Sequence, residues 1–188
     1  YVVNVVSSPG SGKTTLLTEV LTRLSKNHKV AALVGDLATE NDAQRLEQSG
    51  AMVHQITTGT VCHLEAQMIE ESIKQWNLSD LDFLFIENVG NLVCPSSYDL
   101  GENVRVVLFS TTEGEDKPAK YPTIVNSADI TVVTKMDLAD IVDFNREVFY
   151  EAIYASRPEM KIFEVSAKKD VGIDEWIDYL IEEQKKAF

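Results

Sequence analysis

Short apolar runs rich in β-branched residues alternate with helix-like stretches along the whole chain, and this alternation restricts the fold more than any other feature. The seven runs cover residues 1–7, 30–35, 52–56, 83–88, 105–111, 130–134 and 161–166. Helices are expected over residues 13–26, 40–48, 62–76, 143–155 and 173–186. Strands that alternate with helices form a parallel sheet covered by helices on both faces, where the strands are almost continuously apolar. The sequence therefore predicts an α/β domain of three layers with a mostly parallel, buried central sheet.

Length and composition limit the chain to one domain and exclude several classes of partner. The 188 residues, 44% of them hydrophobic, can supply one core, so we expect a single domain over residues 1–188. The formal net charge of −13 would repel a phosphate backbone, so nucleic acid is not an expected ligand. Because no apolar run approaches the roughly 20 residues of a membrane helix, we expect no membrane association and a cytoplasmic location.

A glycine-rich loop lies between the first apolar run and the first expected helix. Its sequence, SSPGSGKTT from Ser7 to Thr15, fits a Walker A phosphate loop except that Ser7 replaces the first glycine, which predicts a less tight turn into the loop. In such a loop, backbone amides surround phosphate oxygens, the lysine contacts the β and γ phosphates, and the next hydroxyl holds magnesium. The expected phosphate-binding residues are Gly10, Ser11, Gly12, Lys13, Thr14 and Thr15.

Two later tetrapeptides favour guanine over adenine as the base. A guanine pocket must accept hydrogen bonds from the N1 and 2-amino groups, which a carboxylate such as Asp137 does well. Residues 134–137, TKMD, fit the [NT]KxD signature of GTP-binding proteins, and residues 165–168, VSAK, resemble a second base-binding loop. The commoner first residue of the signature is asparagine, so Thr134 predicts weaker bracing of the phosphate loop. The residues expected around the base are Thr134, Lys135, Asp137, Ser166, Ala167 and Lys168.

Glu87 and Gly90 provide a candidate magnesium and γ-phosphate sensor. The sequence ENVG, residues 87–90, stands where GTPases keep DxxG, so Glu87 is expected beside magnesium together with Thr14, and the Gly90 amide beside the γ-phosphate. The alternative for Glu87 is a buried structural carboxylate. Asn91, rather than glutamine, follows Gly90, and this predicts slow intrinsic hydrolysis.

Asp36 and Asp42 are further candidates for the reaction. Asp36 follows the second apolar run, and Asp42 lies with Thr39 on a polar segment suited to sensing nucleotide. Asp36 is a candidate magnesium ligand, and both carboxylates are candidates for positioning water. Helix capping is the alternative role for each of them.

Cys62, His63 and Cys94 form a candidate site for a transition metal. Two cysteines are too few for a disulfide framework in a chain of this length, so free thiols or metal ligands are expected. Thiolate and imidazole suit zinc, nickel and copper alike, because selectivity among these metals depends on geometry. Three ligands are one short of a closed tetrahedral site, and a symmetric dimer would complete the coordination. The alternative is that the cysteines are packing residues.

The irregular stretch over residues 88–104 connects the two candidate sites. Gly90 and Cys94 are four residues apart, so their Cα atoms lie within about 14 Å of each other. Pro95 disfavours helix at Cys94 and predicts an extended loop there. A loop of this kind can move with the nucleotide state, so we expect nucleotide binding, metal binding and dimerisation to be coupled.

Four sequence blocks together resemble the HypB family, the nickel-insertion GTPases of hydrogenase maturation. They are SSPGSGKTTLLTE, TGTVCHLEAQMI, ENVGNLVCPSSYDLGE and TTEGEDKPAKYP, and the likeness runs along nearly the whole chain. The resemblance implies a homodimeric P-loop GTPase of the signal-recognition and nitrogenase-iron-protein (SIMIBI) class. It also implies a small nickel-binding partner (HypA-like), a hydrogenase large subunit as client, and nickel or zinc on Cys62, His63 and Cys94. An N-terminal metal-binding extension found in some members is absent from these residues.

Two other functions remain open at this point. The chain could be the accessory GTPase of another metalloenzyme, such as urease or a cobalamin-dependent mutase. It could also be a metal-storage module whose nucleotide site is vestigial, although Lys13, Thr14 and Asp137 argue against this.

Overall fold

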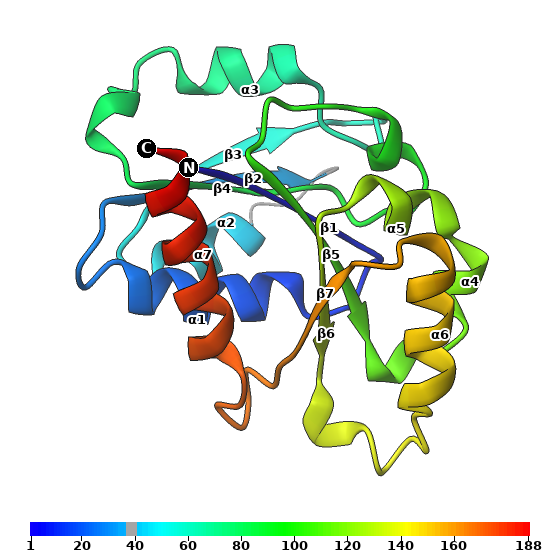
Figure 1. The fold of residues 1–188 in the computed structure, drawn as a ribbon. Coiled ribbons are helices and arrows are strands. Elements are labelled where there is room, and N and C mark those ends of the chain that lie inside the picture. The colour runs from blue at the N-terminus through cyan, green and yellow to red at the C-terminus, as the bar shows by residue number, and fades with distance from the viewer. Residues whose placement is uncertain (37–40) are drawn as a thin grey trace.

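The computed structural model describes residues 1–36 and 41–188 and places the predicted strands in one twisted sheet (Figure 1). The strands are β1 (Val2–Ser7), β2 (Val30–Asp36), β3 (Met52–Thr57), β4 (Phe83–Glu87), β5 (Val104–Ser110), β6 (Ile130–Thr134) and β7 (Lys161–Glu164). Their order is β3-β2-β4-β1-β5-β6-β7, and every described pairing between them is parallel. The prediction of a mostly parallel central sheet is confirmed.

Helices cover both faces of this sheet, as predicted for a domain of three layers. The α-helices are α1 (Lys13–Leu24), α2 (Asn41–Glu47), α3 (Ala66–Ile73), α4 (Lys117–Lys120), α5 (Pro122–Ser127), α6 (Arg146–Ser156) and α7 (Ile173–Ala187). Short 3-10 helices are η1 (Leu78–Asp80), η2 (Cys94–Ser97), η3 (Thr111–Glu113) and η4 (Met136–Leu138). Side chains of α1, α2 and α7 pack on one face of the sheet, and those of α3, α5 and α6 on the other.

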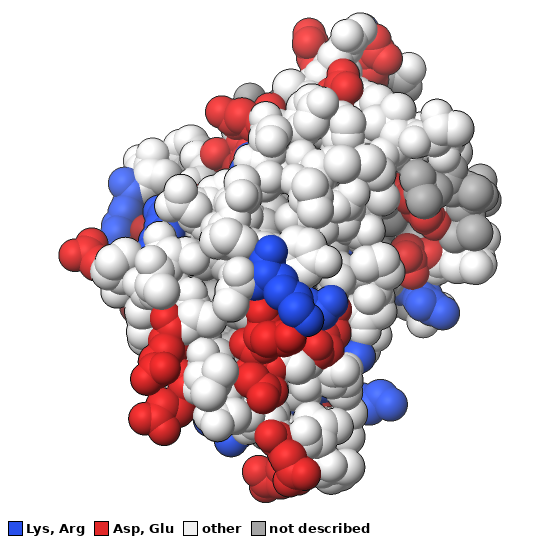
Figure 2. All heavy atoms as spheres, turned by 90° about the vertical axis from the view of Figure 1, so that its right-hand side faces the viewer, with Lys and Arg blue, Asp and Glu red and all other residues white. Residues whose placement is uncertain are grey.

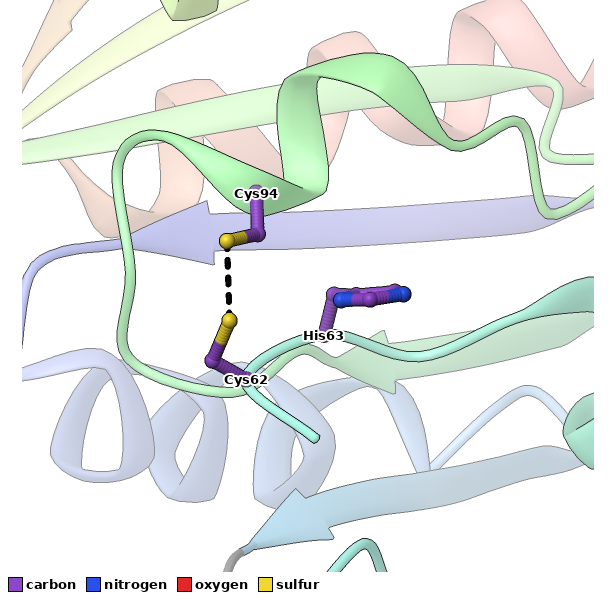
Figure 3. Close-up of side chains that lie close together, drawn as sticks. All are labelled: Cys62, His63 and Cys94. Carbon is purple, nitrogen blue, oxygen red and sulfur yellow. Dashed lines mark hydrogen bonds between the residues drawn. The ribbon is translucent and has the colours of Figure 1, made fainter. Parts of the chain in front are cut away.

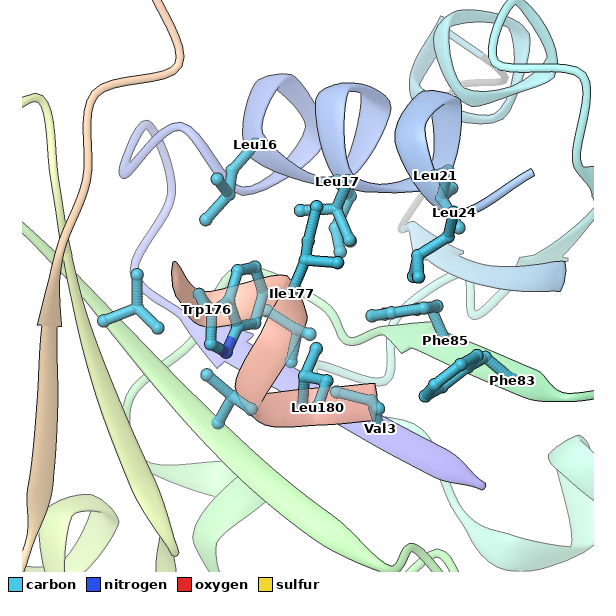
Figure 4. Close-up of a cluster of buried hydrophobic side chains, with 14 of the residues drawn as sticks. Val3, Leu16, Leu17, Leu21, Leu24, Phe83, Phe85, Trp176, Ile177 and Leu180 are labelled. Atoms are coloured by element: carbon cyan, nitrogen blue, oxygen red, sulfur yellow. The ribbon is translucent and has the colours of Figure 1, made fainter. Parts of the chain in front are cut away.

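The largest core cluster lies between the sheet and helices α1 and α7 (Figure 4). Trp176 is fully buried in this cluster, which also contains Leu17 and Val3, and the helical spacing of the apolar residues in α7 gives that helix its buried face. This packing fixes α1 against the sheet. The loop before α1 is therefore held at a constant position relative to the strand ends.

Two predicted features differ in the structure. The helix expected over residues 62–76 begins only at Ala66, because Leu64 is buried against Gly35 and its amide donates to the Asn88 side chain instead of to a helical carbonyl. The third strand is not fully buried: Met52 is exposed, because β3 is an edge strand with a neighbour on one side only. Helices α4 and α5 were not predicted; both carry proline in the first turn, where its missing N–H needs no partner.

The carboxyl ends of the strands collect the polar residues at one edge of the sheet. Ser7, Asp36, Glu87 and Thr134 end β1, β2, β4 and β6. Strand β1 lies between β4 and β5. The chain first forms β2, β3 and β4 on one side of β1, and then β5, β6 and β7 on the other side. Ligands of open α/β sheets bind at the carboxyl edge where the strand order reverses in this way.

The surface is strongly acidic in places. Figure 2 shows Asp and Glu side chains gathered in several clusters on the side of the molecule that carries α6. Exposed carboxylates on and before this helix include Asp140, Asp143, Glu147 and Glu151. Among the described helices, none is long and apolar enough to cross a membrane.

Candidate functional site

The loop between β1 and α1 has the shape of a phosphate-binding loop. Gly10 and Gly12 have φ angles of 76° and 92°, a region that favours glycine, and Gly12 directly precedes α1. Ser7 has no such positive φ, so its backbone needs no glycine. Its hydroxyl donates to the carbonyl oxygen of Ser8 at 2.8 Å and accepts from the Ser11 hydroxyl at 2.8 Å. The turn into the loop is thus held by side-chain hydrogen bonds of Ser7.

Lys13, Thr14 and Glu87 form a buried cluster beneath this loop. The Thr14 hydroxyl donates to Glu87 Oε1 at 2.7 Å, and Lys13 Nζ lies 3.6 Å from the same oxygen. Glu87 is only 2% exposed, and burial raises the pKa of its carboxyl although Lys13 and Thr14 oppose the shift. Its second oxygen, Oε2, is buried and lacks a hydrogen-bond partner. A carboxylate in this state, beside a hydroxyl, fits a site for magnesium, which would satisfy the unpaired oxygen.

A cavity of about 520 Å³ opens over this cluster. Its lining includes the whole stretch from Gly10 to Thr15 together with Asp36, Asp42, Glu87, Gly90 and Lys135. Asp42 lies in the first turn of α2 and accepts from Arg45 at 3.3 Å. Arg45, which was not predicted, also lines the cavity. Thr39 lies outside the described residues.

A second cavity of about 270 Å³ adjoins the first and shares Gly12, Thr15 and Lys135 with it. The rest of its lining brings together both base-binding tetrapeptides: Thr134, Asp137, Val165, Ala167 and Lys168, with Leu16 and Leu138. Ser166 is buried behind this lining, where its hydroxyl donates to Asp137 Oδ1 at 2.5 Å. One carboxylate oxygen of Asp137 is thereby held, and the side chain is oriented within the cavity.

Thr134 and Lys135 brace the phosphate loop from the base side. The Thr134 hydroxyl donates to the carbonyl oxygen of Ser11 at 2.5 Å. Lys135 Nζ donates to the carbonyl oxygen of Gly10 at 2.7 Å, and its backbone adopts a positive φ of 58°. The threonine hydroxyl therefore reaches the phosphate loop directly.

Sequence reasoning assigned no role to the segment that forms η3, although it lies in one of the four blocks quoted above. Glu113 accepts a hydrogen bond from the Ser8 hydroxyl in the phosphate loop and caps η3 through the Ser110 amide. The Thr111 hydroxyl donates to the carbonyl oxygen of Lys135 at 2.9 Å. The segment thus joins the phosphate loop to the base-binding loop. The sequence signal that could have indicated this role is Glu113, an acidic residue directly after Thr111 and Thr112.

The three predicted metal ligands lie together. Their ligand atoms, from Cys62, His63 and Cys94, are all within 4.8 Å of one another, and the two Sγ atoms are 2.8 Å apart (Figure 3). The Cys94 thiol raises the pKa of the Cys62 thiol. Cysteine Sγ and histidine nitrogen atoms at this spacing can bind one divalent transition metal ion.

The imidazole of His63 is held by two neighbours. It stacks on the Tyr98 ring with centroids 3.8 Å apart, and Nε2 lies 3.3 Å from Glu65 Oε1. Nδ1 is buried without a partner, so this nitrogen is the one left for a metal. Tyr98 follows η2, whose first residue is Cys94. The predicted extended loop at Cys94 was wrong, because Pro95 occupies the first turn of η2.

Gly90 lies close to the phosphate loop and belongs to the same segment as Cys94. A Cβ atom at Gly90 would lie 3.1 Å from the Cα and N atoms of Pro9, so a larger residue here would require Pro9 to shift by a few tenths of an ångström. The segment from Glu87 to Cys94 thus begins beneath the phosphate cavity and ends at the thiol pair. This one segment therefore contributes residues to both predicted sites.

Comparison with known proteins gives the chain its family. The description "CobW/HypB/UreG, nucleotide-binding domain" matches residues 1–164. The hydrogenase maturation factor HypB of Escherichia coli is 47% identical over 179 residues, which cover 95% of this chain and 62% of that protein. The hydrogenase/urease maturation factor HypB of Helicobacter pylori is 43% identical over 192 residues, which cover 100% of this chain and 78% of that protein. The chain therefore spans less than two thirds of the length of the first relative.

Solved structures agree with this assignment. The crystal structure of HypB from Helicobacter pylori in complex with nickel superimposes with a TM-score of 0.94 at 44% identity, covering 100% of this chain and 88% of the other. The signal recognition particle 54 kDa protein from Aeropyrum pernix, in complex with GDP, gives a TM-score of 0.66 at 16% identity over 98% of this chain and 49% of the other. The second likeness shows a shared fold alone. With its sequence relatives, matched domain and nearly identical fold, the chain belongs to the HypB family of CobW/HypB/UreG nucleotide-binding domains.

Proposed function

We propose that this domain is a GTP-hydrolysing metallochaperone, which binds nickel at its Cys/His cluster and assists nickel insertion into [NiFe]-hydrogenase. The observation that carries the proposal is the single loop from Glu87 to Cys94, which begins beneath the phosphate loop and ends at the thiol pair. The relatives named as hydrogenase maturation factors, and the relative crystallised with nickel, support the client and the metal.

On the nucleotide side, each role follows from position. Asp137 accepts from the guanine edge, while the Lys135 stem covers the base and the Ala167 amide meets guanine O6. Lys13 contacts the β and γ phosphates, and the Gly90 amide contacts the γ phosphate. Thr14 and Glu87, with Asp36 beside them, would hold magnesium, whose charge offsets that of the phosphates.

Hydrolysis is expected to be slow without a partner. The side chain of Asn91, which follows Gly90, is already engaged in hydrogen bonds. Its Nδ2 donates to the carbonyl oxygen of Cys62, and its Oδ1 accepts from the amide of Val93. Asp36 and Asp42 remain the candidates for orienting the attacking water, because both line the phosphate cavity.

On the metal side, nickel is the cargo. Cys62, His63 and Cys94 supply three ligands per chain, and a homodimer that places two such sets together closes the coordination sphere. Zinc suits the same donors. Thiols that must stay reduced to bind metal support a cytoplasmic location. A small nickel-binding partner of the HypA kind and the hydrogenase large subunit are the proposed upstream and downstream contacts.

A second client is favoured by one observation. The Helicobacter pylori relative is named a hydrogenase/urease maturation factor, so urease is the alternative recipient of the metal. A storage module with a vestigial nucleotide site is disfavoured, since both nucleotide cavities keep their polar lining.

The test measures GTP hydrolysis and nickel binding on the same preparation. We expect GTP turnover that Lys13→Ala abolishes, and nickel binding that Cys94→Ala abolishes and His63→Ala weakens. His54→Ala is the matched control, because His54 lies outside the cluster, beside Trp76. Nickel binding without GTP binding would establish the storage function instead, and GTP turnover with no cysteine-dependent metal binding would exclude a metallochaperone.

A further inference from the structure

The side chain of Asn91 lies between the two segments that carry the cysteines. Its Oδ1 accepts hydrogen bonds from the amides of Val93 at 2.7 Å and Cys94 at 3.3 Å. Its Nδ2 donates to the carbonyl oxygen of Cys62 at 3.4 Å. One amide group therefore contacts the backbone of both thiol-bearing residues, which are 32 positions apart in the sequence.

The Oδ1 and Nδ2 atoms of this amide contact different segments of the chain. An asparagine that only shapes its own turn needs the acceptor contact to the amide two residues later. The donor contact to Cys62 crosses to another segment, and local turn formation does not require it. It links the loop that carries Cys94 directly to the segment before α3 that carries Cys62 and His63.

Asn91 directly follows Gly90, the residue that lies close to the phosphate loop. Gly90 lies close to the backbone of Pro9 in the phosphate loop, so a movement of Gly90 on nucleotide binding would act directly on the adjacent Asn91. A second link exists on the inner side, where Asn88 Oδ1 accepts from the amide of Leu64 at 3.2 Å. The segment from Asn88 to Asn91 is thus joined to the Cys62–Leu64 segment at two points.

We propose that Asn91 is a positioning residue that holds Cys62 and Cys94 at ligand spacing and transmits movement at Gly90 to this pair. The inference rests on the proposed function, because it assigns a means of communication between the nucleotide and metal sites. Asn91 contacts neither nucleotide nor metal in this role. It acts through the backbone of the two cysteines.

Two variants separate the halves of the amide. Asn91→Ala removes all three hydrogen bonds. Asn91→Ser keeps a hydroxyl that can accept from the Val93 amide in a turn of the same kind, but it is too short to reach the Cys62 carbonyl oxygen. Asn77→Ala is the matched control, because Asn77 makes its hydrogen bond to Asp80 within its own turn, away from both sites.

The experiment titrates nickel into each protein bound to GDP and to a non-hydrolysable GTP analogue, and records the nickel–thiolate charge-transfer absorption. We expect Asn91→Ala to weaken nickel binding about 5-fold or more, the effect of losing one or more net hydrogen bonds, and to change the absorption spectrum. Asn91→Ser should keep part of the affinity, but the ratio of nickel affinities in the two nucleotide states should fall towards one. GTP affinity measured without nickel should be unchanged in both variants, because the coupling affects nucleotide binding only when nickel is bound.

Wild-type nickel affinity and spectrum in Asn91→Ala would overturn the positioning role. A wild-type affinity ratio in Asn91→Ser would overturn the transmission through Cys62. Failure of the proposed function has a different result, since wild-type protein itself would then show no cysteine-dependent nickel binding.

Discussion

Gly35 is a position where an added methyl group should overpack the core against a single buried side chain, that of Leu64. A Cβ atom there would lie 2.8 Å from Cγ and Cδ1 of Leu64 and 2.9 Å from Cδ2. Ordinary contact begins at 3.4 Å, so Leu64 must retreat by roughly 0.6 Å, and being fully buried it cannot turn into solvent. Overpacking of this kind costs about 1–3 kcal/mol. Gly35→Ala should therefore lower the midpoint of thermal unfolding by about 2–12 °C.

A double-mutant cycle with Leu64→Ala tests the physical cause. Leu64→Ala by itself should cost about 2–5 kcal/mol, because it leaves a cavity in the core. In that background, Gly35→Ala should cost almost nothing, since the three atoms that it would strike are gone. The measurement is denaturant unfolding of all four proteins at one temperature. An equal cost of Gly35→Ala in both backgrounds would refute the reasoning, as would an unchanged midpoint in the single variant.

Three further predictions concern the sites. Asp137→Asn should weaken GTP by about 10- to 100-fold, the worth of hydrogen bonds to a charged group, and improve xanthine nucleotide; equal GTP affinity by calorimetry would remove Asp137 from the base pocket. Burial raises the pKa of Glu87, so the folded apoprotein holds this proton more tightly than the unfolded chain, and Glu87 lowers stability as pH rises above its ordinary 4.5. Glu87→Gln should flatten that dependence in unfolding experiments with a chelator present, and an unaltered slope would contradict it. Nickel binding should weaken as pH falls, because metal displaces thiol protons and Cys94 raises the pKa of Cys62. Cys62→Ala should remove most of the nickel binding, measured by competition with a chelator. Full retention of binding would mean that the thiols are packing residues.

The strands and the two nucleotide motifs were predictable because both depend on local spacing. An apolar run reports that a segment is covered on both sides, and all seven runs became strands. The loop before α1 needs glycine and lysine at fixed intervals, so its shape depends on consecutive residues such as Gly12 and Lys13. The edge position of β3 was not predictable, since strand order is set by how the crossovers pack and not by the strand's own residues.

For the metal cluster, the sequence predicted the ligands but not their arrangement. The sequence and its family resemblance named Cys62, His63 and Cys94, but only the fold brings their ligand atoms within 4.8 Å. The partners that hold the site escaped prediction: Asn91 was noted only because it stands in place of a water-orienting glutamine, and Tyr98 was given no role. Neither contact leaves a periodic or motif signal.

The sequence by itself determined which segments are strands, and it predicted which loop receives phosphate and which base it favours, because each of these depends on residues close together in the chain. Only the tertiary structure decided that Ser7 and Thr134 can replace the commoner glycine and asparagine, since their hydroxyls find partners across the loop. It also decided that the loop from Glu87 to Cys94 joins the two sites. Contacts between loops at the carboxyl edge depend on strand order and helix packing, which are properties of the whole chain.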